Sequence, residues 1–279
     1  MASNDFSYYE YSTTYNKVAY LKLLGKIEKP DFDQIIDNDR VVLSNSDFKL
    51  YINAIVDINY SDDQGNSLIH YICDYGTVMM LIDTISKGAN LECENNDGKR
   101  PIHLVCKRKR LDMFWTILGY KVNIECADNY GRRPIHYICK YGNLYMLQRI
   151  HMEGAYLVPP DNQGCRPIHL ICRYGTVEML KFMIGCGVHL EYNLDHDGDR
   201  IIHTICRYGT VDMLAAVINR VDLQATSVHL EVYERSDYMT WPIFLDVTNR
   251  KRTTPREIVE LYEREAEFKE LLDRALKKK

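Results

Sequence analysis

Residues 167–191 read PIHLICRYGTVEMLKFMIGCGVHLE, and close variants of this stretch recur through most of the chain. A cysteine follows the histidine of each copy by three residues, and a glycine precedes it by five. The histidines recur at spacings of 33, 33, 33 and 34 residues: His70, His103, His136, His169 and His203. A fixed period of this length is typical of stacked-repeat proteins. The spacing therefore predicts five repeats over residues 62–222.

Each copy predicts two short helices. The glycine before the histidine sits in a turn and is free to adopt a positive φ. Proline marks the start of the first helix in three copies, at Pro101, Pro134 and Pro167. The second helix shows apolar residues at helical spacing, as in VEMLKFMI. One helix pair cannot bury its own apolar faces, so neighbouring copies must stack.

Glycines also predict where the helices end. Those after the first helix fit a left-handed helix end, namely Gly76, Gly142, Gly175 and Gly209. Those after the second helix fit the same role, namely Gly88, Gly154 and Gly187. The second copy departs from both rules, because Lys109 and Lys121 replace the glycines. A left-handed non-glycine residue costs about 1 kcal/mol, so we expect this copy to be the least stable.

The recurring stretch resembles the ankyrin repeat, whose signature combines a turn glycine, Thr-Pro-Leu-His, a glycine, a second helix and a closing Gly-Ala-Asp. The resemblance recurs in register through all five copies. It implies an all-α solenoid, L-shaped in section and slightly curved, with turn tips and first helices forming a concave binding face. The amino-acid sequence of the repeats, such as RPIHYICKYG, also resembles that of ankyrin proteins from giant amoeba-infecting DNA viruses.

The ends of the chain follow the pattern less closely. Residues 1–28 match no pattern, and residues 29–61 are predicted to be a degenerate N-terminal cap. Residues 251–279 are predicted to be a degenerate C-terminal ankyrin cap that ends in a charged helix. The interval between His203 and the equivalent Glu257 is 54 residues, so residues 223–250 are an insertion. Partial alternation in SVHLEVYE and WPIFLDV predicts a hairpin there.

Composition excludes several classes of protein. The 279 residues are 46% apolar and 27% charged with a net charge of −4, which disfavours a disordered chain and a general nucleic-acid binder. No window is apolar enough to span a membrane, and the polar start is unlike a secretory signal. Nine cysteines without such a signal indicate free thiols. We expect a monomeric cytoplasmic protein.

The recurring His-x-x-Cys pair could in principle bind metal. Zinc requires four converging ligands, whereas successive pairs belong to successive repeats. We therefore expect these histidines and cysteines to pack in the core, and Cys93, Cys126, Cys165 and Cys186 to be more exposed. The chain contains no GxxxxGK, HExxH or GxSxG motif. We expect no catalysis, no cofactor and no metal.

Arginine replaces the threonine that ankyrin repeats usually carry three residues before the histidine, which puts the usual Thr–His hydrogen bond in doubt. The replacements are Arg100, Arg133, Arg166 and Arg200, and only Ser67 keeps a hydroxyl. Acidic residues in the preceding turns offer partners for these arginines: Glu92, Glu125 and Glu191. We expect a ladder of ion pairs, each of which contributes little.

The resemblance places the fourth and fifth residues after each histidine on the concave face. These positions carry cations and tyrosines, and the turn tips add Lys99, Tyr130, Arg132 and Gln163. The predicted partner-binding residues are Tyr75, Lys107, Arg108, Lys140, Tyr141, Arg173, Tyr174, Arg207 and Tyr208. Tyrosine and arginine are enriched at interface hot spots, and cations suit an acidic protein segment.

Three alternatives to an acidic protein partner remain open. The charged face can be solvated without any partner. The basic and aromatic strip can bind nucleic acid, although the net charge opposes this. The chain can also be an adaptor that recruits host ubiquitin machinery, although it shows no F-box-like segment.

Overall fold

The computed structural model describes residues 27, 30, 32, 36–37, 40–41, 43–188, 190, 194–226, 248–262 and 266–276. The chain divides into two compact units, Met1–Asn123 and Ile124–Lys279. The predicted segment 1–28 lies outside the described residues apart from Ile27, as does the predicted hairpin.

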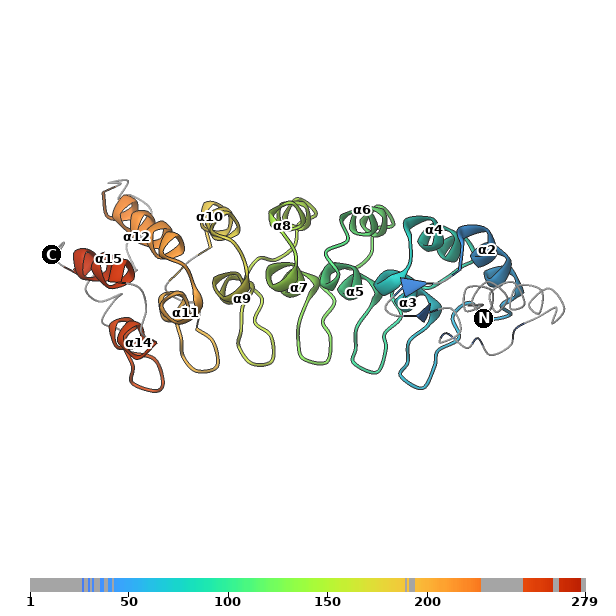
Figure 1. Cartoon of the computed structure of the whole chain (residues 1–279), viewed down its shortest axis with the longest axis horizontal. Helices are drawn as coiled ribbons and strands as arrows, with labels where there is room; N and C mark the ends of the chain where they lie inside the picture. Colours follow the sequence, from blue (N-terminus) through green and yellow to red (C-terminus); the bar gives the residue numbers. More distant parts are fainter. Residues whose placement is uncertain are drawn as a thin grey trace, which may run out of the picture. The chain divides into compact units, whose positions relative to one another are not determined.

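Helix pairs make up most of the first unit. A two-residue hairpin, β1 (Ile36–Asp37) and β2 (Arg40–Val41), precedes them. The helices are α2 (Asn45–Ala54), α3 (Leu68–Tyr75), α4 (Val78–Ser86), α5 (Pro101–Lys107) and α6 (Leu111–Gly119). The first helices α3 and α5 pack together, and α2, α4 and α6 form a second row (Figure 1). The predicted cap therefore contributes α2 to the stack.

The second unit repeats this arrangement. Its helices are α7 (Pro134–Tyr141), α8 (Leu144–Met152), α9 (Pro167–Tyr174), α10 (Val177–Gly185), α11 (Ile201–Tyr208), α12 (Val211–Thr226), α14 (Pro255–Leu261) and α15 (Ala266–Leu276). The helices α7, α9, α11 and α14 form one row, and α8, α10, α12 and α15 form the other (Figure 1). The described chain is an all-α repeat solenoid, as predicted.

Buried aliphatic side chains join the two helices of each repeat. In the second unit, Ile138 of α7 and Leu147 of α8 are fully buried, as are Ile171 of α9 and Leu180 of α10. Burying such a side chain contributes roughly 1.5–3 kcal/mol. Helices of seven to nine residues are not stable alone, so this burial is what stabilises them.

The glycines that follow the first helix require a correction. Their φ angles lie between −77° and −87°, so they are not left-handed. Glycine is needed there for space instead: a Cβ on Gly142 would lie 2.7 Å from the carbonyl oxygen of Ile138. The left-handed conformation predicted for the glycines after the second helix is confirmed, because Gly88, Gly154 and Gly187 have φ of 95°, 90° and 81°. The positive φ predicted at the turn tips is also confirmed, because Gly131 has φ 75°.

Lys109 and Lys121 both have positive φ, at 58° and 54°. Lys121 therefore adopts the conformation of the glycines it replaces. Lys109 differs from the glycines that it replaces, because their φ is negative. The helix α5 ends one residue earlier than α7 does, and the backbone N–H of Arg108 caps it by donating to the carbonyl of Leu104. The helix end in this repeat thus differs from its siblings and places a lysine in a strained region.

Candidate binding surface

The predicted partner-binding residues lie at the C-terminal ends of the first helices. In the second unit, Tyr141, Tyr174 and Tyr208 are the last residues of α7, α9 and α11, and a cation precedes each. In the first unit, Tyr75 ends α3, whereas Lys107 ends α5. Cations at helix C-termini are favoured by the helix dipole.

In the first unit, Arg108 already has a partner. Its guanidinium pairs with the carboxylate of Asp74, with Nη2 3.2 Å from Oδ2. The same group lies 4.7 Å from the centroid of the Tyr75 ring. Lys107 is exposed beside it. Asp74 therefore neutralises most of the charge of Arg108.

In the second unit, cations and tyrosines alternate from one repeat to the next. Lys140 Nζ lies 5.2 Å from the Tyr174 ring centroid, the Arg173 guanidinium 4.9 Å from Tyr208, and that of Arg207 5.8 Å from Tyr262. Each such contact contributes about 0.5–1 kcal/mol at exposed sites. We call these residues the Tyr–cation array: Lys140, Tyr141, Arg173, Tyr174, Arg207, Tyr208 and Tyr262.

Tyr262 was not among the predicted residues. It follows Glu257 by five residues, as Tyr208 follows His203, so the repeat register could have identified it. It forms the C-cap of α14 and is 47% exposed. The array therefore extends one repeat further than the five predicted repeats.

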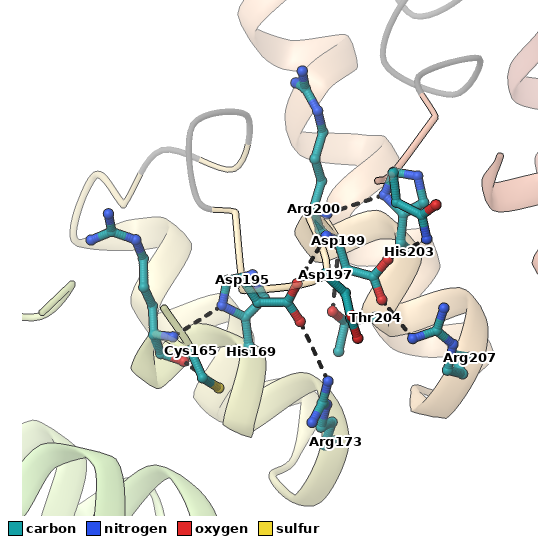
Figure 2. Close-up of polar contacts among 12 residues, drawn as sticks. Cys165, His169, Arg173, Asp195, Asp197, Asp199, Arg200, His203, Thr204 and Arg207 are labelled. Carbon is teal, nitrogen blue, oxygen red and sulfur yellow. Dashed lines mark hydrogen bonds and ion pairs between the residues drawn. The ribbon is translucent and has the colours of Figure 1, made fainter. Parts of the chain in front are cut away.

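Two aspartates from the turn at Asp195–Asp199 approach the arginines of the array (Figure 2). Arg173 Nη2 lies 3.5 Å from Asp195 Oδ2, and Arg207 Nη1 lies 2.6 Å from Asp199 Oδ2. Asp199 is fully buried, and it accepts a second hydrogen bond of 2.6 Å from Asn249 Nδ2. These aspartates offset much of the positive charge that the sequence places on the array.

Arg207 is less accessible than Arg173, whose side chain is 27% exposed. The side chain of Arg207 is 9% exposed. Burial by itself lowers the pKa of Arg207, but Asp199 and the hydroxyls of Tyr262 and Tyr208 together raise the pKa above its ordinary value. Arg207 therefore remains charged and serves mainly to hold α11 to its neighbours. Its predicted contact with a partner stays a prediction.

Lys140 differs from both arginines. Its ammonium lies 4.9 Å from the Tyr141 ring centroid and 5.2 Å from that of Tyr174. Within the described part of the chain, no carboxylate lies within ion-pair distance of it. Lys140 is therefore the cation of the array with the most charge available to a ligand.

The recurring histidines cap the first helices. Each Nδ1 accepts a hydrogen bond from the backbone N–H three residues earlier, at 3.0–3.2 Å. Because the donor is the backbone, arginine can replace threonine without loss of this bond. All five histidines are at most 1% exposed, which confirms the predicted core packing. Burial lowers the pKa of His70 and of His136, so both are neutral near pH 7.

The cysteines behave as core residues. Cys73, Cys106, Cys139, Cys172 and Cys206 are buried, and burial raises the pKa of Cys73, Cys139 and Cys172. The predicted exposure of Cys126 is wrong, because this residue is only 6% exposed. In the described residues no group of three His, Cys, Asp or Glu side chains is placed to hold a metal ion.

The arginines before the histidines form the predicted ion pairs in two repeats. Arg100 pairs with Glu92, and Arg133 pairs with Glu125. Each glutamate also accepts a backbone N–H at 2.8 Å, from Asn123 and Tyr156 respectively.

The other two arginines differ. Arg166 donates to the carbonyl of Val158 instead of to a carboxylate. The predicted partner of Arg200, Glu191, lies outside the described residues.

The helix pairs, turn glycines and buried histidines together define a helical repeat solenoid. Residues 69–161 match the family model of ankyrin repeats in three copies. Such repeats are generally non-catalytic protein–protein interaction modules. The chain matches no curated protein, so the narrower resemblance to giant-virus proteins stays a prediction. None of the described helices is both long and apolar enough to cross a membrane.

Proposed function

We propose that this protein is a non-catalytic binding module that holds an acidic segment of a protein partner on the Tyr–cation array. The observation that carries the proposal is the run of exposed tyrosines along one side of the second unit. Tyr174, Tyr208 and Tyr262 are 57%, 47% and 47% exposed. Rigid aromatic side chains flanked by cations are typical of interface hot spots.

The array is ordered before any partner binds. Each cation lies against a tyrosine of the next repeat, and the arginines are further fixed by Asp195 and Asp199. A partner therefore meets side chains that lose little conformational freedom on binding. Such preorganisation strengthens binding without additional contacts.

Binding of nucleic acid is the second candidate. Tyrosines interleaved with guanidinium groups favour base stacking. The ion pairs of Arg173 and Arg207 argue against it, because their charges are already offset within the protein. A protein partner is the better fit. We place this function in the cytoplasm and assign it to a monomer, with a host protein as partner if the viral resemblance reflects the source.

Affinity capture from cell lysate with two matched variants tests the proposal. Lys140→Glu/Tyr174→Ser/Tyr208→Ser alters the array, whereas Lys181→Glu/Tyr145→Ser alters exposed residues of α10 and α8. Both must give the circular dichroism spectrum of the wild type. We expect a partner that is retained by the second variant and lost by the first. Retention by both variants would contradict the proposal, and capture of nuclease-sensitive material alone would favour nucleic acid.

A further inference from the structure

A cavity of about 110 Å³ opens between α7 and α9 in the second unit. Its lining includes three cations, two tyrosines of the array and one carboxylate: Arg132, Lys140, Arg173, Tyr141, Tyr174 and Asp161. The space exceeds what a single water molecule needs, so a side-chain group can enter it. The cavity thus lies within the surface proposed to bind the partner.

The charges around the cavity do not cancel. Arg132 lies 3.7 Å from Asp161, and Arg173 lies 3.5 Å from Asp195. These two pairs are neutral as units. Lys140 has no such carboxylate among the described residues, so one positive charge is in excess once Asp195, which lies outside the lining, is counted against Arg173. Within a partly enclosed site, that charge attracts an anion more strongly than an exposed lysine would.

The residue beside the buried aspartate differs between the two repeats that line this cavity. In the preceding repeat the hydroxyl of Tyr137 donates to Asp128 Oδ2 at 2.6 Å and covers it. Leu170 occupies the equivalent position beside Asp161 and has no hydroxyl to donate. Asp161 pairs with Arg132 instead, and the aliphatic side chain of Leu170 lines the cavity.

His136, which is 1% exposed, adds a hydrogen-bond donor to the lining. Its Nδ1 accepts from the backbone N–H of Arg133 at 3.0 Å, so the neutral ring carries its proton on Nε2. The carbonyls of Cys165 and Pro159 approach the ring, but Nε2 forms no hydrogen bond of normal geometry. In the first unit, by contrast, His70 Nε2 lies 3.0 Å from the carbonyl oxygen of Lys99. Because Nε2 of His136 is itself buried near these two carbonyls, Lys140 is the group that a ligand in the cavity would meet.

We propose that this cavity receives one side-chain carboxylate, from an aspartate or glutamate of the partner's bound segment. The carboxylate pairs with Lys140 between the rings of Tyr141 and Tyr174. A single negative charge matches the single uncompensated cation, whereas a doubly charged phosphate would leave one negative charge unmatched. This inference rests on the proposed function and narrows the acidic preference of the array to one position.

Selected peptides provide the test. Random 15-residue peptides displayed on phage are selected on the immobilised full chain, and the Kd of each enriched peptide is measured by fluorescence anisotropy. We expect one invariant acidic position and about tenfold weaker binding to Lys140→Met. Lys181→Met, the same change on α10, should leave the Kd unchanged. Replacing the invariant acidic residue of the peptide by its amide should raise the Kd about tenfold for the wild-type protein. The same replacement should raise the Kd less than twofold for Lys140→Met.

Other outcomes separate the two proposals. Peptides that lose affinity for Tyr174→Ser/Tyr208→Ser but bind Lys140→Met as tightly as wild type would overturn the cavity inference alone. A selection that yields no peptide sensitive to either substitution would overturn the proposed function and the inference together. Equal weakening by Lys140→Met and Lys181→Met would mean a general charge effect, which also overturns the inference.

Discussion

At the residue scale, the second unit contains one ion pair that is almost completely buried. Asp199 is fully buried, and it receives hydrogen bonds from Arg207 and from Asn249. Such pairs contribute little net stability compared with apolar residues, but removing one partner leaves a buried charge unpaired. Arg207 is therefore needed for the structure whether or not it contacts a partner.

Arg207→Met should destabilise the protein by about 3 kcal/mol, because Asp199 would lose its charged partner. Chemical denaturation followed by circular dichroism measures this change. Arg256→Met is the matched control in the same unit, since its pairs with Glu260 and Asp273 involve an arginine that is 52% exposed. This control substitution should lower the free energy of unfolding by at most about 1 kcal/mol. Equal costs would show that Arg207 is not held in a buried pair.

The buried histidines make stability depend on pH. Burial lowers the pKa of His70 against the opposing effect of the Lys99 carbonyl, and it lowers the pKa of His136 against that of Asp161. The unfolded chain therefore binds more protons than the folded chain below the ordinary histidine pKa of about 6.5. The histidine contribution to stability should be constant well above pH 6.5, and stability should fall as the pH drops through about 6.5 towards the lowered pKa values. Equal melting temperatures at about pH 7.5 and 5.5 would contradict this.

At the scale of elements, glycine has two different roles that the sequence does not distinguish. After the second helices it permits a positive φ, and after the first helices it permits close approach to an isoleucine carbonyl. The sequence predicts a glycine-dependent helix end in both cases. Only the path of the following chain decides which property is needed, which is why the left-handed prediction fails for Gly76, Gly142, Gly175 and Gly209.

Lys109→Gly should stabilise the second repeat by about 1 kcal/mol, because Lys109 has φ 58°. The melting temperature should rise by about 2–4 °C. Lys107→Gly is the control, since Lys107 is the last residue of α5 and glycine lowers helix stability by roughly 0.5–1 kcal/mol. A lower melting temperature for Lys109→Gly would mean that the lysine side chain contributes more than its backbone strain costs.

At the scale of the whole molecule, periodicity was sufficient to predict the repeats, because each copy confirms the register of the next. The resemblance to ankyrin repeats named six of the seven residues of the array, all but Tyr262, and their contact with a partner stays a prediction. The sequence did not predict that Asp195 and Asp199 would offset the arginines, because turn residues meet helix ends only through the folded path of the chain. The sequence likewise did not predict the cavity beside Lys140, because the residues that line it come from two repeats and from the turns before them.

These internal pairs decide how the whole chain responds to nucleic acid. The net charge is −4, and Asp74 and Asp195 offset Arg108 and Arg173. We expect a random 20-nucleotide single-stranded DNA to bind with a Kd weaker than about 10⁻⁴ M at physiological salt. Fluorescence anisotropy measured over a range of salt concentrations checks this.

The variant Asp74→Asn/Asp195→Asn shows whether the ion pairs are the cause. Asparagine stands at the position of Asp195 in two other turns, at Asn95 and Asn249, so the turn can retain its shape. The substitution leaves both arginines without their carboxylates. DNA affinity should then increase and depend more steeply on salt, because each released cation can displace a counterion from the phosphates. Tight binding by the wild type would instead show that the paired arginines still engage phosphate, and the choice of a protein partner would fail.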